Sequence, residues 1–404
     1  MAIKNPTRLI AVTVASLGLA VALTAQAVSS VSTRKAPSIA VSTFPANGLA
    51  REALAFQNFT LAVAEEAEPA AAASQVADQA LLAVKSDPLA PKAYALIALA
   101  QGEAGAGGDL LEAASQLNRR DLNLQSQLLQ KHLAAEDYER SINTLDQILR
   151  VHPEYASEFF PVLTSALNEP NTVPLFADIL DGSSPWHRKF LNFSVRRGGS
   201  LTSLAELRPQ ISSADDIFDK QLIASLAAQG QADAAASIYQ LVSVPEVRET
   251  ASTSLDWVSE YPPFDWQLVD DAGFRSQPSR DGEELELFVR PGKGGLIAGR
   301  FLPAPAAPFA LRIEHDIKPA HQQEDVSIQM TCTNDGQMVL DRTFEDGASV
   351  FQVPSLPADC QFVVLAINAR AWTGRTALRG SIGRIAIVPS GETANGTAAA
   401  TPAP

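Results

Sequence analysis

The sequence has few of the residues on which catalytic and metal sites are usually built. Five histidines are spread over 404 residues, and no two of them stand four positions apart, a spacing that helical zinc sites often use. A glycine-rich phosphate loop, a nucleophile elbow and a Walker motif are all missing. We therefore expect a protein that is not an enzyme and that uses no cofactor and no metal.

Positive charge is also in short supply. The chain has 31 Lys and Arg against 45 Asp and Glu, which gives a formal net charge of −14. Binding of nucleic acid needs a concentrated basic surface, so the composition argues against DNA and RNA as partners. An anionic ligand would have to bind at a local exception to this balance.

Charge is absent from residues 9–28, which follow Lys4 and Arg8 near the N-terminus. Two interpretations stay open. Residues 1–28 are either a signal peptide, cleaved after the small residues of Ala25–Ala27, or an anchor that spans the inner membrane with residues 9–28. Both place the body outside the cytoplasm, as a periplasmic, secreted or membrane-anchored protein. Residues 29–48 are rich in Ser, Pro and Ala and are predicted to form a spacer.

Cysteine is rare, and the two that are present, Cys332 and Cys360, lie in the last quarter of the chain. In an exported protein such a pair is bridged more often than free. Each shares the alternation of apolar residues beside it: Val326, Ile328 and Met330 for the first, and Phe362, Val364 and Ala366 for the second. We therefore predict a disulfide that joins two inward-facing strand surfaces.

Aromatic residues make up only 6% of the chain and alanine is frequent, which indicates helices that pack through small side chains. Turn signals recur with steps of 33, 32, 32, 30 and 30 residues, at Pro88, Asp121, Pro153, Pro185, Asp215 and Pro245. A recurrence of this length with two helices per unit is typical of stacked helical repeats. Residues 49–245 are predicted to form such an array.

The stretch EDYERSINTLDQILRVHP, which ends at Pro153, resembles the tetratricopeptide repeat family. Its small and apolar residues fall at the second-helix positions of that family, at Tyr138, Ser141, Leu145 and Ile148. A second match, LIASLAAQGQADAAASIYQLV, has Gly230 at the turn between helices. Ser141 departs from the usual alanine, and the middle units are interrupted by Pro161, Pro170 and Pro174. The resemblance implies a helical solenoid that binds a protein partner in the cell envelope. Within the first stretch we expect three residues to face neighbouring helices, namely Ile142, Leu145 and Leu149.

Residues 262–389 have a different pattern, with short alternating strands between Gly, Pro and Asp turns. The segments are EELELFV, GLIAGRFL, FALRIEHDI, DVSIQMTCT, QMVLDRTF, ASVFQVP, CQFVVLAIN and SIGRIAIVP. They predict an antiparallel β-sandwich of the jelly-roll kind. Residues 390–404 are predicted to be a disordered tail. The predicted fold class is thus α+β and multidomain, an α-helical solenoid followed by an antiparallel β-sandwich.

The strand region also resembles the carbohydrate-binding-module-like jelly rolls that follow tetratricopeptide regions in bacterial envelope proteins. The segments that carry this resemblance are FDWQL, GLIAGRFL, FALRI, IQMTC and FQVPSLPADCQ. It implies a sandwich that binds a glycan or caps the helices. It also implies an accessory role in cell-envelope or exopolysaccharide assembly, with a surface polysaccharide as a ligand.

The candidate binding residues lie in ARAWTGRTALRGSIGR, within a stretch from Cys360 to Pro389 that has no acidic residue. They are Arg370, Trp372, Arg375 and Arg379. An exposed Trp beside Arg suits stacking on a sugar ring together with pairing to carboxylate or phosphate. The other interpretation, which we favour, is that Trp372 fills the sandwich interior and the arginines lie on an ordinary solvated face.

Three other groups of residues can be interpreted either as functional or as purely structural. Glu283 and Glu284 are the candidates for a polysaccharide-acting enzyme, and residues 281–286 with Asp270 and Asp271 could hold Ca²⁺, although solvated loop carboxylates are the default. The stretch PWHRKFLNFSVRR is a partner surface or a repeat helix that buries its rings and exposes its bases. Trp266 and His315 are expected in the core.

These patterns together predict a non-catalytic exported scaffold or adaptor. Its helical repeats would bind an envelope protein, and its sandwich would bind a glycan or act as a cap. The alternative is an enzyme, a glycoside hydrolase or lyase with acidic residues in the sandwich.

Overall fold

The structure, a computed structural model, describes residues 6–102, 106–169, 171–243, 254–305, 308–353 and 356–389. It contains two compact units, Met1–Ala166 and Leu167–Pro404. The predicted helical region 49–245 contributes to both units. Its last helices belong to the same unit as the strands.

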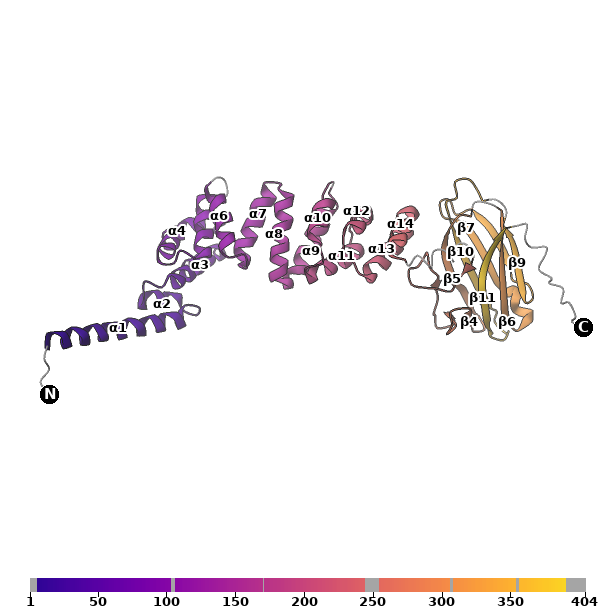
Figure 1. Cartoon of the computed structure of the whole chain (residues 1–404), viewed down its shortest axis with the longest axis horizontal. Helices are drawn as coiled ribbons and strands as arrows, with labels where there is room; N and C mark the ends of the chain where they lie inside the picture. Colours follow the sequence, from indigo (N-terminus) through magenta and orange to yellow (C-terminus); the bar gives the residue numbers. More distant parts are fainter. Residues whose placement is uncertain are drawn as a thin grey trace, which may run out of the picture. The chain divides into compact units, whose positions relative to one another are not determined.

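The first unit is helical, and consecutive helices from α3 to α8 pack against each other (Figure 1). Its helices are α1 (Pro6–Ser32), α2 (Pro37–Thr43), α3 (Gly48–Ala64), α4 (Pro69–Ser86), α5 (Pro91–Gln101), α6 (Ala106–Leu117), α7 (Leu122–Ala134), α8 (Tyr138–Val151), η1 (Pro153–Tyr155) and α9 (Ala156–Leu167). The predicted turns at Pro88 and Asp121 each lie between helices, and Pro153 begins the short turn after α8. The predicted pairs of helices are therefore confirmed, while membership of the tetratricopeptide family stays a prediction.

Asp and Asn side chains fix where several of these helices begin. The carboxylate of Asp121 accepts a hydrogen bond from the backbone N–H of Leu124, and Asp137 accepts one from Arg140. Each bond satisfies an amide that the helix itself leaves unpaired, which is worth about 1 kcal/mol. The predicted inward face of α8 is confirmed, because Ile142, Leu145 and Leu149 are all buried. Burial of such side chains contributes about 2 kcal/mol each.

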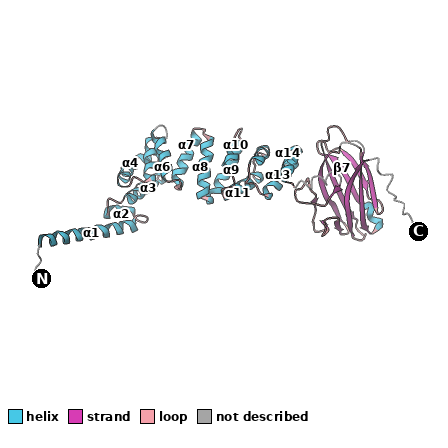
Figure 2. Cartoon of the chain, viewed as in Figure 1, coloured by secondary structure: helices cyan, strands magenta, loops and turns pink. Residues whose placement is uncertain are grey.

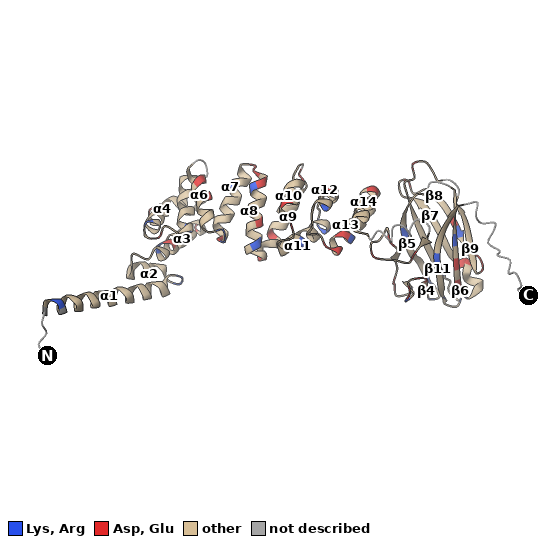
Figure 3. Ribbon diagram, viewed as in Figure 1, with Lys and Arg blue, Asp and Glu red and all other residues tan. Residues whose placement is uncertain are grey.

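Helix α1 is long and apolar enough to cross a membrane, from Ile10 to Ser32, by length and composition. Its apolar side chains are exposed in the structure. No charged residue follows Arg8 along the helix, as Figure 3 shows. This helix fits either a signal sequence or an anchor.

The prediction of a plain spacer over residues 29–48 is wrong. The segment contains the end of α1, the whole of α2 and a buried polar cluster. The Ser29 hydroxyl donates to the carbonyl of Ala40 over 2.8 Å, and the Asn47 amide donates to the hydroxyls of Ser29 and Thr33. A helix of seven residues has too few turns to show an apolar period, so the sequence pattern could not reveal α2.

The second unit begins with shorter, less regular helices. They are α10 (Val173–Ile179), α11 (Pro185–Arg196), α12 (Leu201–Leu207), η2 (Arg208–Gln210), α13 (Asp216–Ala228) and α14 (Ala232–Val242). Pro161 lies inside α9 and Pro174 in the first turn of α10, where proline needs no backbone donor. Pro170 lies outside the described residues. Of the two described prolines, Pro174 accompanies the short helix α10, whereas Pro161 lies within a helix of 12 residues.

The rest of the second unit is a sandwich of two antiparallel sheets (Figure 2). One sheet has the order β3-β4-β11-β6-β9, with β1 beside β11, and the other has the order β2-β5-β10-β7-β8. The strands are β1 (Ser254–Leu255), β2 (Gln267–Leu268), β3 (Phe274–Pro278), β4 (Leu285–Val289), β5 (Lys293–Pro303), β6 (Phe309–Lys318), β7 (Val326–Cys332), β8 (Met338–Thr343), β9 (Ala348–Val353), β10 (Phe362–Ala371) and β11 (Leu378–Pro389). All eight predicted strands are present, and the predicted fold class is confirmed. Strands β1, β2 and β3 were not among the predicted segments.

The disulfide between Cys332 and Cys360 is confirmed, with a Cα–Cα distance of 5.6 Å. The predicted inward direction of Cys332 is confirmed, because its side chain is buried. The bridge does not join two facing sheets, however, because β7 and β10 are neighbours in one sheet. The inward face of β10 carries Val363, Leu365 and Ile367, one position out of phase with the prediction. Cys360 precedes the first residue of β10, so it does not share the alternation of that strand.

Candidate ligand-binding site

The candidate residues gather where strand β10 ends. Arg370 is the last residue but one of β10, and Trp372 begins the turn to β11. Gly294 of β5 lies so close to the backbone of Ala369 and Arg370 that a Cβ atom there would overlap both. Glycine thus lets β5 pair with this end of β10, and the pairing fixes the backbone that carries Arg370 and Trp372.

Arg370 and Trp372 form a stacked pair at the surface. The guanidinium carbon of Arg370 lies 4.0 Å from the centroid of the Trp372 ring, within the range of a cation–π contact. Trp372 is 46% exposed. The interpretation of Trp372 as an interior plug is therefore wrong. The interior at this end is filled by its neighbour Ala371 and by Leu378.

Asp325, the last residue of the 3₁₀ helix η3 (Ala320–Asp325), holds this turn with both carboxylate oxygens. The indole N–H of Trp372 donates to Asp325 Oδ1 over 2.9 Å, and Nη1 of Arg375 lies 3.3 Å from Asp325 Oδ2. The Gln322 amide adds a hydrogen bond to the Thr376 hydroxyl. Two elements that are about 50 residues apart in the sequence are thus tied together at this point.

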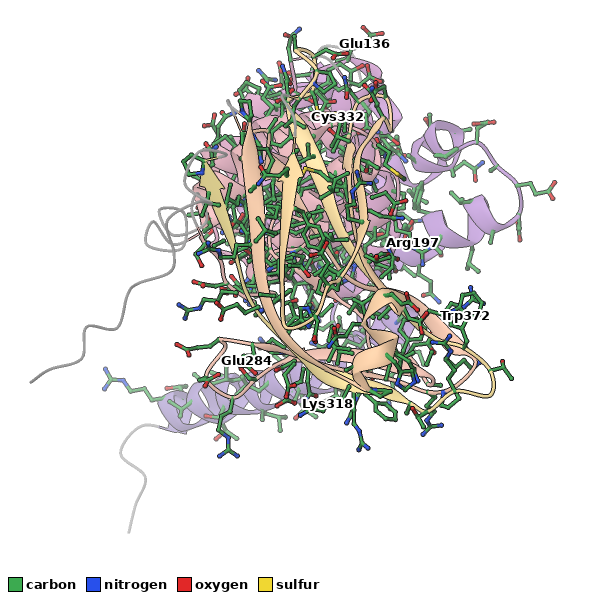
Figure 4. All side chains as sticks on the ribbon, turned by 90° about the vertical axis from the view of Figure 1, so that its right-hand side faces the viewer. Glu136, Arg197, Glu284, Lys318, Cys332 and Trp372 are labelled. Atoms are coloured by element: carbon green, nitrogen blue, oxygen red, sulfur yellow. A yellow bond between two sulfur atoms is a disulfide. The ribbon has the colours of Figure 1, made fainter. Side chains whose placement is uncertain are left out.

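We name the group of Arg370, Trp372, Arg375 and Asp325 the tip cluster. Figure 4 shows Trp372 toward the lower end of the sandwich, away from Cys332 at the upper end. The fourth candidate, Arg379, is exposed on β11 and is paired in register with Lys318 of β6. The structure therefore brings three of the four candidates into one cluster and places Arg379 on the neighbouring sheet.

The acidic candidates lie elsewhere on the sandwich. Glu283 is 3.4 Å from a guanidinium nitrogen of Arg384, which also pairs with Asp256 at 3.1 Å. Glu283 and Glu284 line a shallow cleft of about 310 Å³. Arginine also lines this cleft, so the two carboxylates are not isolated from positive charge. The cleft shares no residue with the tip cluster.

In the loop of residues 281–286, the candidate Ca²⁺ site, the Asp281 carboxylate is hydrogen-bonded within the turn between β3 and β4. Asp281 accepts hydrogen bonds from the Ser279 hydroxyl and from the backbone N–H of Glu283. The bond from Ser279 is the main reason that the pKa of Asp281 is lowered. In the described part of the chain no three His, Cys, Asp or Glu side chains are grouped so that they could hold a metal ion.

A buried polar contact joins the last helix to the sandwich within the second unit. The hydroxyl of Tyr239, on α14, donates to Asp265 Oδ1 over 2.9 Å, and Asp265 Oδ2 accepts from the backbone N–H of Tyr261. The Tyr239 ring stacks on Phe264 with centroids 5.2 Å apart. Asp265 is only 2% exposed, and these two hydrogen bonds satisfy its buried carboxyl oxygens.

Sequence reasoning missed Asp325 and Asp265. A signal for Asp265 was available, because it stands between aromatic residues in FDWQL and an acid in that setting is often buried with a donor. Asp325 carried no such signal, since only the folding of η3 against the β10–β11 turn brings it to Trp372. Trp266 is fully buried, as predicted. The prediction of His315 in the core is only partly right, because its side chain is half-buried: it packs on Phe344, and Nε2 contacts the Glu345 carbonyl.

The basic and aromatic stretch of residues 185–197 forms helix α11. Its rings at Trp186 and Phe190 are buried, with Phe190 stacked on Phe176 at 5.7 Å and Trp186 beside them. Arg188 and Lys189 are exposed. Trp186 and Phe190 are thus buried and Arg188 and Lys189 exposed, as the simpler interpretation predicted, while Phe193 is half-buried. Whether the helix is a partner surface stays a prediction.

The helices of the first unit form a shallow hollow of about 250 Å³ between α6, α7 and α8. Glu112 lies at its edge, 2.6 Å from Lys131 and 3.5 Å from Arg140. His132 lines the hollow, and burial lowers the pKa of its imidazole, so the ring is neutral at pH 7. The hollow combines a neutral floor with a charged rim.

No protein-family model matches the chain, and no curated protein matches it. Among solved structures, the chain is similar to accessory secretory protein 1, 2 and 3 from Streptococcus pneumoniae, with 13% identity and a TM-score of 0.22, over 33% of this chain and 95% of that one. It is also similar to TmCBM61 in complex with β-1,4-galactotriose, with 9% identity and a TM-score of 0.22, over 33% of this chain and 98% of that one. Likenesses this slight carry no argument about what the chain binds.

Proposed function

We propose that this protein is a non-catalytic binding protein of the cell envelope, whose sandwich binds an acidic saccharide at the tip cluster. The observation that carries the proposal is the stacked pair of Arg370 and Trp372. Its ring is nearly half exposed, and its indole N–H is fixed on Asp325. An aromatic ring held in one orientation is a platform for the C–H face of a sugar ring.

The charges around this platform favour an acidic ligand. Asp325 neutralises Arg375, whereas in the described chain no Asp or Glu lies within ion-pairing distance of Arg370 or Arg379. An unpaired guanidinium can bind a carboxylate through two parallel hydrogen bonds. A uronic acid presents such a carboxylate on a ring that can also stack. This chemistry fits a surface polysaccharide better than a neutral glycan.

Helix α1 serves in this proposal as a membrane anchor that is not cleaved. The helix runs without interruption through Ala25–Ala27, and one turn later Ser29 is fully buried and bonded to Ala40. Cleavage there would require the backbone beside Ser29 to unwind from this contact. Mass analysis of the native protein tests the point: retention of residues 1–28 is expected, and a mature chain that begins at Val28 would contradict it.

The helical array contributes a second binding surface in this proposal. The hollow between α6, α7 and α8 has charged side chains at its rim and a buried, neutral His132 beneath, which suits an extended peptide of a protein partner. Crosslinking from the native envelope would identify that partner. Arg140→Glu reverses a rim charge and should reduce the yield of crosslinks through this face.

The experiment that tests the saccharide proposal is a glycan array probed with the full chain in detergent. Binding to uronic-acid glycans that is lost in Trp372→Ala and kept in Arg342→Ala, which removes an exposed arginine on β8, is expected. Binding that is equal in both variants would overturn the proposal. The alternative of an enzyme predicts shortened products from the same glycans and their loss in Glu283→Gln.

A further inference from the structure

The second unit contains a cavity of about 500 Å³ between helix α14 and one edge of the sandwich. Its wall is mostly apolar. The residues that line it include Ala236 of α14 and, from the sandwich, Phe264, Leu302, Phe362 and Ile387. The size is that of a pocket for a small organic ligand, which is usually apolar with a few polar groups that fix orientation. It shares no residue with the tip cluster.

One charged side chain also lines this cavity. Arg300, on β5, is only 4% exposed, and its Nε has no hydrogen-bond acceptor among the described residues. No Asp or Glu of the described chain lies within ion-pairing distance of it. Its guanidinium carbon lies 5.9 Å from the centroid of the Trp266 ring. The carboxylates of Asp265 and Asp256 act on Arg300 electrostatically from beyond ion-pairing distance. Asp265 accepts its hydrogen bonds from Tyr239 and from the backbone N–H of Tyr261.

A buried guanidinium that makes no ion pair is costly, because the protein interior solvates charge less well than water does. Burial accordingly lowers the pKa of Arg300, although an arginine stays protonated at pH 7. The cost falls when an anion occupies the cavity and accepts the unused N–H groups. The apolar wall, in turn, requires that the rest of the anion be apolar.

We propose that the cavity between α14 and β5 binds an apolar monocarboxylate, with its acid group on Arg300 and its hydrocarbon body against Phe264, Leu302 and Phe362. Charge complementarity selects the acid over an alcohol or an amine of the same length. The apolar wall makes affinity rise with chain length, by about fourfold for each methylene that enters the cavity. The rise ends when the cavity is full.

The test uses the full chain in lipid nanodiscs with Trp372→Phe, which removes the exposed tryptophan. The probe is decanoate with bromine on its last carbon, which quenches nearby tryptophans such as Trp266. Saturable quenching by the acid is expected, with a midpoint at least tenfold lower than that of the matching bromo-alcohol. Partitioning of each probe is measured with empty nanodiscs and subtracted, and it is the same for every variant, so the remaining differences arise at the site.

Two variants test separately what the charge of Arg300 and the volume of the cavity contribute to binding. Arg300→Met should weaken binding of the acid at least tenfold and leave binding of the alcohol unchanged. The thermal midpoint of this variant should equal or exceed that of the parent chain, since a buried unpaired charge is removed. Ala236→Phe fills the cavity from α14 and should weaken both probes. Arg342→Met replaces an exposed arginine and is the matched control; it should change the binding of neither probe. Equal midpoints for acid and alcohol in the parent chain, absence of saturation, or an acid midpoint unchanged by Arg300→Met would each overturn the proposal.

Discussion

The indole N–H of Trp372 donates to the carboxylate of Asp325 over 2.9 Å, although the two residues are 47 positions apart. The second oxygen of the same carboxylate pairs with Arg375. Trp372 is therefore fixed in orientation while nearly half of its surface stays exposed. A ring that is already ordered loses little conformational entropy when a ligand stacks on it.

Asp325→Ala should release the ring without removing it. We expect saccharide binding to weaken about two- to tenfold, because the ligand then has to order one or two side chains at a cost of about 0.5 to 1.5 kcal/mol each. Fluorescence anisotropy of Trp372 should fall in the same variant. Asp341→Ala removes an exposed carboxylate from β8 and is the matched control, with no expected change. Unaltered binding in Asp325→Ala would show that the ring needs no fixing.

The disulfide should contribute strongly to the stability of the sandwich. Cys332 and Cys360 are separated by 28 residues, and closing a loop of that length in the unfolded chain is worth about 3 to 4 kcal/mol. The double variant Cys332→Ser with Cys360→Ser should lower the free energy of unfolding of the strand region by that amount, measured by urea titration of its buried tryptophans. An unchanged urea midpoint would contradict the prediction, as would alkylation of both thiols in the native protein.

The contact between Tyr239 and Asp265 should stabilise the junction of α14 with the sandwich. Tyr239→Phe removes one of the two donors to a buried carboxylate, which costs about 1 to 3 kcal/mol. The control is Tyr94→Phe, because the hydroxyl of Tyr94 bonds the Pro88 carbonyl at the surface and its loss should cost within about 0.5 kcal/mol. Equal thermal midpoints for the two variants would show that the buried bond adds nothing.

Glu52 should make the first unit less stable as pH rises. Its carboxylate is 6% exposed and accepts hydrogen bonds from the backbone N–H groups of Lys92 and Ala93. Burial raises its pKa above the ordinary 4.5, and the two backbone bonds offset this only in part. The folded chain thus holds this proton more tightly than the unfolded chain.

The stabilisation from Glu52 is therefore fully present below pH 4.5 and is lost as pH rises through the raised pKa of the folded state. Glu52→Gln does not titrate and keeps one acceptor. Its free energy of unfolding should increase relative to that of the parent chain as pH goes from about 4 to 7. Urea titrations of both chains across that range check the sign, and a constant difference would contradict it.

The periodic parts of the fold could be predicted from the sequence, and the parts that depend on distant contacts could not. The helix pairs followed from turn signals such as Asp121, and the strands from alternation as clear as that of β7. The phase of β10 was wrong because Cys360 precedes the strand. The short strands β1 and β2 have two residues each, too few for any period.

The candidate site could be predicted only in part, for a related reason. Arg370, Trp372 and Arg375 are close in sequence, so their composition alone marked them. The orientation of Trp372 could not be predicted, because its hydrogen-bond partner Asp325 is brought to it only by the folding of η3. Arg300 stands in GLIAGRFL, where alternation alone could not reveal that its side chain would be buried without a partner.

The most direct test of the saccharide proposal is a calorimetric titration of the full chain with an oligogalacturonate and with its fully methyl-esterified form. The two ligands share a ring skeleton and differ in charge. We predict that the acid binds at least tenfold more tightly than the ester, and that Arg370→Ala combined with Trp372→Ala abolishes binding while Arg342→Ala does not. Equal affinity for acid and ester, or full binding by the double variant, would contradict the account.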